Sequence, residues 1–251
     1  MSSWSAKRRF AYGGSVIIIV ALVLSGIAWK ILNRAPTCSD GKKNGDEKEI
    51  DCGGSCKLIC TSDALSPIVL WSNVFNVSGD LYIATAYIQN PNINSRNPKA
   101  DYKFQIFDNN NKLIATKVGL TSIPKNQKFA VFETGIILKG VKPKSAEFQF
   151  TALSQWEKVT EKEPDVSLHY GTLLATSTQP RVEGTITNNY LNTIPQIELA
   201  VLIMDNKENV LATSRTFVDN LLKGTSQDFV FSWPKPFDFD PSVVSVIFRQ
   251  I

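Results

Sequence analysis

The chain has 251 residues, of which 43% are hydrophobic and 20% are charged, with a formal net charge of +4. This composition excludes wholesale disorder, and the length suffices for one large or two small domains. Residues 1–34 hold five of the 27 basic residues and no acidic residue, so the remainder is near neutral, with 22 bases against 23 acids. A nucleic-acid binder would carry positive charge on its folded domain, so nucleic acid is not an expected partner.

The first predicted element is a membrane-spanning helix over residues 10–32. Residues 10–29 form a run of 20 residues without a charge, and a helix of that length spans a hydrocarbon core of roughly 30 Å. Phe10 begins this run, and Tyr12 and Trp29 lie near its ends, where amphipathic rings favour the membrane interface. We therefore expect these three residues to belong to a membrane anchor in contact with the lipid bilayer.

The flanking charges predict the orientation of this helix. Three bases at positions 7–9 precede the apolar run, and Lys30 and Arg34 follow it. The positive-inside rule places the more basic flank in the cytoplasm. Residues 1–9 are thus predicted to be cytoplasmic and the C-terminal domains extracytoplasmic. A cleaved signal peptide is the alternative, because residues 26–28 are a small-residue Gly-Ile-Ala site.

A cysteine-rich stalk is predicted over residues 36–62. It contains all four cysteines of the chain, Cys38, Cys52, Cys56 and Cys60, separated by thirteen, three and three residues. Exported thiols are oxidised, so an even number in a short Gly-rich segment predicts two disulfides, whose connectivity the spacing leaves open. A zinc thiolate site and redox chemistry are the alternatives, although paired C-x-x-C knuckles are absent from the sequence.

Oxygen-bearing side chains lie between these cysteines and make the stalk a candidate calcium site. Calcium takes six to eight oxygen ligands, and a disulfide-closed loop can hold them at the required radius. A solvated acidic loop, with its charge offset by neighbouring lysines, is the alternative. The candidate ligands are Asp40, Asn44, Asp46, Glu47 and Asp51.

The same stretch resembles a short cysteine-rich motif of surface and secreted proteins. Residues 38–56 match the pattern C-x-D-G-x-x-N-G-D-E-x-x-x-D-C-G-G-x-C, while three residues rather than the usual two separate Cys56 from Cys60. The resemblance implies an extracellular location and a stabilised stalk next to all-β domains.

The rest of the chain contains an internal repeat. FDNNNKLIAT at 107–116 and MDNKENVLAT at 204–213 are offset by 97 residues, and YIQN at 87 and TITN at 185 by 98. A nearly constant offset indicates two tandem copies of one fold. The predicted domains cover residues 65–157 and 164–251.

Each copy is predicted to be an antiparallel β-sandwich. Apolar residues alternate with other residues at 101–106 and at 196–203, which is typical of strands with one face on a single core. The Asn-rich and Asp-rich segments that follow predict hairpin turns. About seven short strands per copy predict an all-β fold class, two tandem immunoglobulin-like β-sandwiches.

The repeats also resemble two families of extracytoplasmic modules. Residues 184–188, the 205–213 hairpin and residues 222–225 with Phe229 are similar to FxLYD-type domains. The segment YIQNPN at 87–92 is similar to a strand end of the late-embryogenesis-abundant type 2 sandwich. The resemblance implies the sandwich fold and no particular activity.

Catalytic patterns are weak in this sequence, so an enzyme is not expected. His169 is the only histidine and has no nucleophile motif beside it. Asp238 and Asp240 lie in PFDFDP, which reads as a loop. Aromatic alternations are interpreted as core: Phe148, Phe150, Phe229, Phe231 and Trp233.

These features favour a single-pass, membrane-anchored extracytoplasmic protein that presents two sandwiches to a protein or cell-envelope polymer. A hydrolase that uses carboxylates or a metal is one alternative, and a structural spacer is another.

Overall fold

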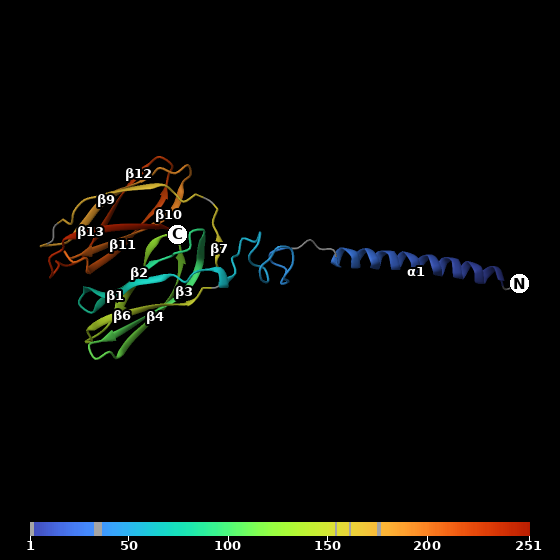
Figure 1. Ribbon diagram of the computed structural model, residues 1–251, viewed down its shortest axis with the longest axis horizontal. Helices are drawn as coiled ribbons and strands as arrows, with labels where there is room; N and C mark the ends of the chain where they lie inside the picture. The colour runs from blue at the N-terminus through green and yellow to red at the C-terminus, as the bar shows by residue number, and fades with distance from the viewer. Residues whose placement is uncertain (1–2, 33–36, 154, 161, 175–176) are drawn as a thin grey trace. The chain divides into compact units, whose positions relative to one another are not determined.

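The computed structural model describes residues 3–32, 37–153, 155–160, 162–174 and 177–251 (Figure 1). Arg34 and the first residue of the predicted stalk, residue 36, lie outside the described residues. The chain forms two compact units, of which the first ends at Cys56 and the second runs from Lys57 to Ile251.

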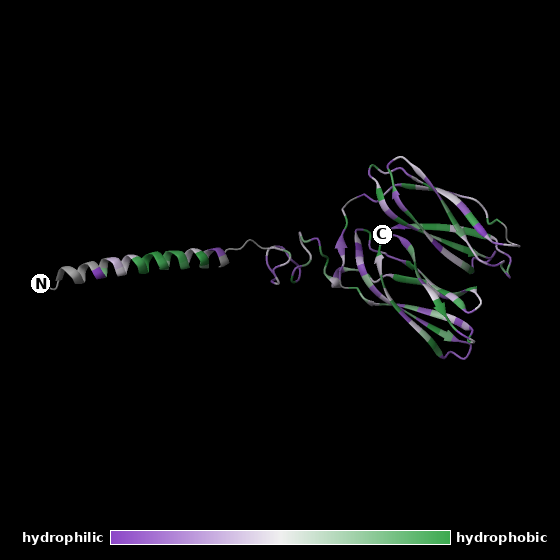
Figure 2. Ribbon diagram, turned by 180° about the vertical axis from the view of Figure 1, so that it is seen from behind, coloured by the Kyte–Doolittle hydropathy of each residue, from purple (hydrophilic) through white to green (hydrophobic). Residues whose placement is uncertain are grey.

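The first unit begins with a long apolar helix, α1 (Ser3–Leu32). Its stretch Tyr12–Lys30 is long and apolar enough to cross a membrane, and none of it is buried. Figure 2 shows the apolar residues concentrated in this stretch. Phe10 and Trp29 are exposed as well. Apolar side chains exposed on every face of a helix are unfavourable in water, and the length and composition of this helix fit a membrane anchor or a signal sequence.

The second unit consists mainly of antiparallel strands. A short 3-10 helix, η1 (Thr61–Asp63), precedes them. The described strands are β1 (Ile68–Ser78), β2 (Leu81–Gln89), β3 (Ser95–Asp108), β4 (Leu113–Ile123), β5 (Lys128–Ile137), β6 (Pro143–Ala152), β7 (Glu157–Lys158), β8 (Val166–Tyr170), β9 (Arg181–Asn188), β10 (Ile194–Met204), β11 (Val210–Leu221), β12 (Ser226–Ser232) and β13 (Val243–Gln250).

These strands build two sandwiches of the same topology. In the first, sheet β1-β2-β5 packs on sheet β4-β3-β6, and in the second, sheet β8-β9-β12 packs on sheet β11-β10-β13. The order corresponds to strands A-B-E and C′-C-F of an immunoglobulin-like sandwich. The predicted fold of two tandem β-sandwiches is confirmed. Each copy has six main described strands rather than about seven, and the two-residue β7 pairs with the start of β3.

Each sandwich encloses its own hydrophobic core. Phe104 and Ile106 of β3 and Ile88 of β2 are fully buried in the first core. Val201 and Ile203 of β10 and Ile186 of β9 take the corresponding places in the second core. Complete burial of such a side chain contributes about 1.5–3 kcal/mol to folding, so the inward-facing residues of these strands stabilise each copy.

A buried asparagine at the end of the second strand is repeated in both copies. The Asn90 side chain donates hydrogen bonds to the carbonyls of Ser95 and Pro124 and accepts one from the backbone N–H of Asn92. Asn188, 98 residues later, has the same role: it donates to the carbonyls at 192 and 221 and accepts from the N–H at 190. Both asparagines are fully buried. Each one joins the turn after its strand to the end of the fourth strand of its copy.

The hairpin after the third strand is repeated as well. Asp108 accepts hydrogen bonds from the backbone N–H groups of Asn110 and Lys112, and Asp205 accepts the equivalent bonds from residues 207 and 209. Asn111 and Glu208 have positive φ angles of 58° and 65°. The turns predicted from the Asp-rich and Asn-rich segments are therefore present at both sites.

The two sandwiches pack against each other through non-equivalent sheets. The outer face of β1-β2-β5 contributes Phe75, Ile83 and Phe132 to a shared apolar cluster, and the outer face of β11-β10-β13 contributes Ala200 and Ile247. Each of these sheets is consequently covered on both faces. Nearly every residue of a central strand in such a sheet is buried.

Strand β10 corrects one expectation from the sequence. Residues 196–203 were expected to bury one face on a single core, but Glu198, Ala200 and Leu202 are also buried. They lie on the face turned toward the first sandwich. The expectation was wrong for this strand because alternation within one strand carries no information about a neighbouring domain.

A buried ion pair lies in this interface. Arg249 of β13 donates a hydrogen bond from Nε to Glu198 and two from Nη1, to the Thr121 hydroxyl and to the Ser122 carbonyl of the first sandwich. Arg215 lies 3.3 Å from the same carboxylate. The charges are compensated and hydrogen-bonded, as burial requires. This network links the second sandwich to the end of β4.

The segment that opens the second unit is attached to the first sandwich. The backbone N–H of Ile59 donates to the carbonyl of Trp156, and Lys158 donates to the carbonyl of Lys57. Glu157 lies 3.1 Å from both the Lys57 ammonium and the Arg96 guanidinium. Residues 57–62 of the predicted stalk thus belong to the same compact unit as the sandwiches.

Candidate functional site

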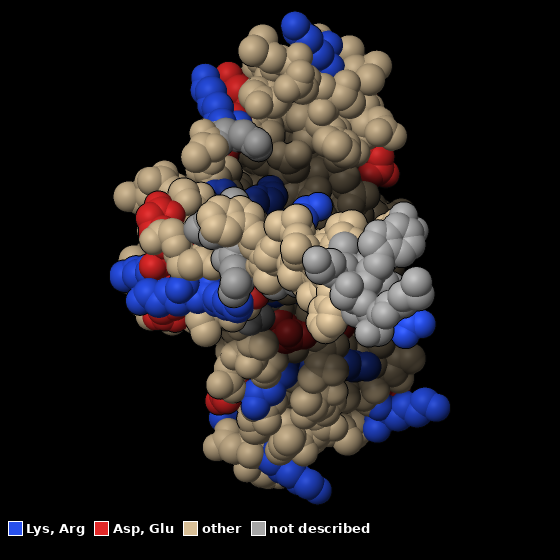
Figure 3. All heavy atoms as spheres, turned by 90° about the vertical axis from the view of Figure 1, so that its right-hand side faces the viewer, with Lys and Arg blue, Asp and Glu red and all other residues tan. Residues whose placement is uncertain are grey.

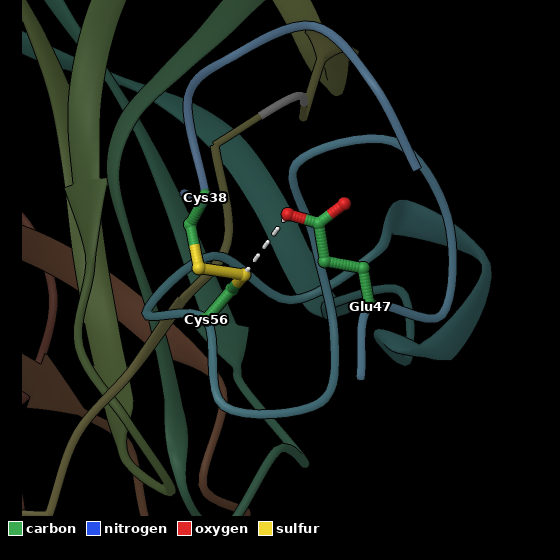
Figure 4. A group of neighbouring side chains, drawn as sticks. All are labelled: Cys38, Glu47 and Cys56. Carbon is green, nitrogen blue, oxygen red and sulfur yellow. Dashed lines mark hydrogen bonds between the residues drawn. A yellow bond between two sulfur atoms is a disulfide. The ribbon is translucent and has the colours of Figure 1, made fainter. Parts of the chain in front are cut away.

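The cysteines of the predicted stalk are oxidised. Cys38 and Cys56 form a disulfide (Figure 4), and Cys52 and Cys60 are each disulfide-bonded as well. The prediction of disulfides is confirmed, and the Cys38–Cys56 pairing answers a question that the spacing left open. Sulfur atoms in disulfides are not thiolates, so they do not form the zinc site considered as an alternative.

The carboxylates of this loop bind backbone N–H groups. Asp51 accepts hydrogen bonds from the amides of Asp40 and Gly41, and Glu47 accepts them from the amides of Asn44 and Asp51. The Asn44 side chain donates to Asp40 at 2.8 Å, and this bond lowers the pKa of Asp40. Such bonds stabilise a short loop that has no regular secondary structure.

Tight backbone packing also shapes the loop. Gly54 has a φ of +53°, and a Cβ at this position would lie 2.0 Å from the carbonyl oxygen of Asp46. Ser55 donates a hydrogen bond to the Asp46 carboxylate at 2.7 Å. A residue with a side chain cannot replace Gly54 without moving the backbone around it.

The five predicted calcium ligands are not brought to one point. Within the described part of the loop, Glu47 is the one predicted ligand that joins a close group, together with Cys38 and Cys56, whose sulfurs are bonded to each other (Figure 4). Asp40 and Asp51 use their oxygens on separate amides. Calcium binding stays a prediction.

A groove of about 620 Å³ lies where the two sandwiches meet, and this volume is typical of ligand sites. Strand β1, the β1–β2 turn and the start of β2 form one side, and strand β11 with the loop between β12 and β13 forms the other. Its aromatic, polar and charged lining residues are Phe75, Asn76, Tyr82, Lys142, Thr213, Trp233, Lys235, Phe237, Asp238 and Phe239.

Three aromatic residues at one side of this groove pack on one another. The rings of Phe237 and Phe239 are stacked, with centroids 4.5 Å apart and planes 19° from parallel. Trp233 meets Phe237 edge-on at 5.2 Å. Trp233 is only 7% exposed, yet its indole N–H has no hydrogen-bond acceptor among the described residues. A buried donor without an acceptor is unusual and costly, and this nitrogen has essentially no surface exposed to the groove.

The polar groups of the groove are mostly donors. Lys235 donates to the Asn76 side-chain oxygen, and the Asn76 amide donates to the Gly79 carbonyl at 2.8 Å. Lys142 is exposed at the same groove. Asp238 is the one acidic residue among the described lining residues. The groove therefore combines apolar and aromatic lining residues with an excess of positive charge.

The residues considered for catalysis do not meet in this groove. His169 is exposed on the edge strand β8. Asp238 lines the groove, whereas Asp240 is not among its described lining residues. Most glycoside hydrolases use two carboxylates on either side of the scissile bond, and the described lining supplies one.

The aromatic prediction holds for most of its residues. Phe148, Phe229 and Phe231 are buried in the cores, and Phe150 packs against the first core. Trp233 is also part of the second core but lines the groove as well. Sequence reasoning did not identify Lys235, Phe237 or Phe239, although two aromatic residues alternating with acids between prolines, in PKPFDFDP, were an available signal.

Charge on the molecular surface is mixed. Figure 3 shows Lys and Arg side chains interspersed with Asp and Glu on the face it presents, without a continuous basic stripe. No family model and no curated protein matches this chain. The resemblances to the cysteine-rich surface motif and to FxLYD and late-embryogenesis-abundant modules therefore stay predictions.

Proposed function

We propose that this chain is a single-pass membrane protein that holds two β-sandwiches outside the cytoplasm, where their groove binds a protein or an envelope polymer. The observation that supports this proposal most directly is the order of three features: an exposed apolar helix, a disulfide-bonded loop and a β-sandwich pair. Disulfides persist in oxidising compartments, so they favour an exported location for the segment after α1.

The packing between the sandwiches favours binding over a purely structural spacer. A spacer requires only that two domains follow one another, whereas here a buried ion pair and a shared apolar cluster hold the two copies together. The two walls of the groove come from different sandwiches. The contact between the sandwiches therefore holds the two walls at a constant separation. Preorganisation of this kind reduces the entropy cost of binding.

The location is tested by protease protection of the full chain, tagged at both ends, in membrane vesicles of known orientation. In right-side-out vesicles, external protease is expected to remove the C-terminal tag while the N-terminal tag stays protected. The opposite pattern would contradict the proposed orientation. Release of the chain into the soluble fraction with a mass that lacks residues 1–28 would identify a signal peptide instead of an anchor.

A further inference from the structure

The turn between the second and third strands exposes an apolar side chain in both copies. Ile93 lies in the turn between β2 and β3, and Leu191 lies 98 residues later in the turn between β9 and β10. They are 68% and 72% exposed. Each turn is held by the buried asparagine of its copy, which accepts a hydrogen bond from the backbone N–H two residues on. Single exposed apolar residues are common, but here the exposure is repeated at the equivalent position of a second copy.

A second exposed leucine accompanies each of these turns. Leu65 is bonded through its backbone N–H and carbonyl to the Asn92 side chain, at 2.8 and 2.7 Å. Leu222 lies in the turn that is bonded to the carbonyl of Asn188 through the N–H of Gly224. Both leucines are exposed. Each copy therefore presents two apolar side chains from neighbouring turns.

Both pairs lie at the same end of the second unit. The turn that carries Ile93 is hydrogen-bonded to the β4–β5 turn through the N–H of Asn126. The turn that carries Leu191 is bonded to the segment before β8 through the N–H of Asn189. The β4–β5 turn and the segment before β8 line one groove between the sandwiches. The four exposed side chains are therefore grouped around one end of the sandwich pair.

This end also carries the connection to α1. The carbonyl of Lys57 accepts a hydrogen bond from the N–H of Lys158. The next residue, Val159, donates to the carbonyl of Asn94, which follows Ile93. The chain consequently enters the second unit beside the exposed turns.

The Cys38–Cys56 disulfide shortens the tether between α1 and this end. In the sequence, 24 residues separate Leu32 from Lys57, and they reach up to about 85 Å when fully extended. With the disulfide, the covalent path runs through the six residues 33–38 and then across 5.6 Å between the two cysteine Cα atoms. This path spans at most about 30 Å. An α1 helix in a membrane therefore keeps the end that carries Lys57 near the lipid surface.

We propose that this end of the sandwich pair rests on the lipid bilayer, with Ile93 and Leu191 at the boundary between headgroups and acyl chains, and that the loop disulfide holds it there. Apolar side chains gain free energy on leaving water, and a short tether raises the effective concentration of the surface. The inference rests on the proposed function, because it requires α1 to span the membrane. The groove beside Trp233 lies at the opposite end, next to the β1–β2 turn, so a docked unit presents this groove away from the membrane.

The test uses the full chain in nanodiscs of phosphatidylcholine and phosphatidylglycerol that contain a lipid with a nitroxide near the top of its acyl chain. Methyl NMR measures the paramagnetic broadening of isoleucine and leucine side chains, each assigned by its loss in a single serine variant. Ile93 and Leu191 are expected to lose most of their signal. Ile137, which is 63% exposed beside the β1–β2 turn at the opposite end, is the matched control and is expected to keep its signal.

A pair of double variants separates docking from tethering, since a tether alone would also keep this end nearer the membrane. Ile93→Ser with Leu191→Ser removes the apolar contacts and is expected to raise the signal of the two accompanying leucines at least twofold. Leu113→Ser with Ile137→Ser removes the same two side-chain types from exposed positions at the opposite end and is expected to leave that signal unchanged. Both double variants are first compared with the wild type in thermal unfolding.

A Gly/Ser insertion directly before Cys38 tests the tether without changing the disulfide. The insertion has 18 residues, which is the separation that the disulfide bridges. It is expected to raise the signal of the accompanying leucines, because a longer tether lowers the effective concentration of the surface. An insertion without effect would overturn the role assigned to the disulfide.

Two results would overturn the docking itself. The first is that Ile93 is broadened no more than Ile137. The second is that the accompanying leucines stay as broad in Ile93→Ser with Leu191→Ser as in the wild type, which would identify a tethered unit that tumbles freely. The methyl signals of Ile17 and Ile18 in α1 distinguish these failures from that of the proposed function. If they are broadened while Ile93 is not, docking alone is refuted, and if they are not broadened, α1 is outside the bilayer and both proposals fail.

Discussion

The two sandwiches share their inner architecture and differ in their outer faces. Equivalent inner positions are apolar in both copies, whereas equivalent outer positions are not. Ile83 and Thr85 of β2 are buried in the interface, but the corresponding Arg181 and Glu183 of β9 are exposed and form a salt bridge of 2.7 Å. The inner pattern follows from the fold, and the outer pattern follows from which sheet meets a neighbour.

The third strands of the two copies, β3 and β10, also differ on their outer faces, but here the buried outer face belongs to the second copy. Residues 101, 103 and 105 of β3 are only half-buried, while their equivalents Glu198, Ala200 and Leu202 of β10 are buried. Each copy thus buries the outer face of a different sheet. A heterologous contact of this kind could continue to further copies, but the sheets at the two ends of this stack carry polar residues at the equivalent positions, which favours a pair that ends at two.

The largest effect is expected from a substitution that removes a charge buried between the two sandwiches. Glu198→Gln leaves the buried Arg249 without its counter-charge, and such a loss costs about 3–5 kcal/mol of unfolding free energy. The equivalent substitution in the first copy, Asp101→Asn, is expected to change the free energy of unfolding by less than about 0.5 kcal/mol. Urea denaturation of both variants measures the difference. Equal effects would show that the two faces are not distinguished as the structure indicates.

The buried asparagines should instead show that the copies are alike. Asn90→Ala and Asn188→Ala each remove a buried side chain that pairs with one backbone N–H and two carbonyls. We expect each change to cost about 2–3 kcal/mol, since unsatisfied buried groups lose their full desolvation energy. Thermal unfolding of the two variants should give similar decreases. A decrease confined to one copy would mean that the repeated hydrogen bonds have different roles.

A smaller effect is expected at a pair of equivalent second-strand positions. The Thr85 hydroxyl bonds that of Thr213 across the interface at 2.8 Å, and both residues are buried. Thr85→Val should destabilise the chain by about 1–2 kcal/mol because Thr213 is left unpaired. Glu183→Gln, at the equivalent exposed position, should cost less than about 0.5 kcal/mol. A Thr85→Val variant as stable as the wild type would indicate that this hydrogen bond contributes nothing to the interface.

The smallest expected effect concerns a contact made by the first sandwich. Burial opposes the ionisation of Glu157, but hydrogen bonds from Lys57 and Arg96 outweigh it and lower the pKa below its usual 4.5. A carboxyl group with a lowered pKa stabilises the fold above the unfolded-state pKa, and this stabilisation is lost as the pH falls through the folded-state value. Glu157→Gln should therefore lower the Tm at neutral pH. The corresponding decrease in the free energy of unfolding is expected to be less than about 1 kcal/mol.

The pH dependence provides the control for this last prediction. The difference in Tm between the wild type and Glu157→Gln should shrink as the pH is lowered below about 4.5. Glu147→Gln, at an exposed position of β6, should show no such difference at any pH. If both variants behaved alike, the Lys57 and Arg96 contacts would have no specific effect on Glu157.

The sequence was sufficient for features that depend on residues close together in the chain. The uncharged run of 20 residues, the clustered cysteines, the repeat offset near 98 and the Asp-initiated hairpins all predicted local structure that the chain adopts. Strand alternation identified the inner faces because side chains of a strand point to opposite sides with a period of two. These features predicted the two tandem sandwiches, although not the number of strands in each.

The tertiary structure alone decided everything that depends on contact between distant residues. The Cys38–Cys56 pairing, the burial of Glu198 against Arg249 and the meeting of Phe237 with Lys142 and Asn76 in one groove involve residues 18 to 161 positions apart. Local patterns cannot specify such contacts, because the same alternation allows either sheet of a sandwich to meet its neighbour. The packing of one copy on the other made that choice, and it formed the groove at the same time.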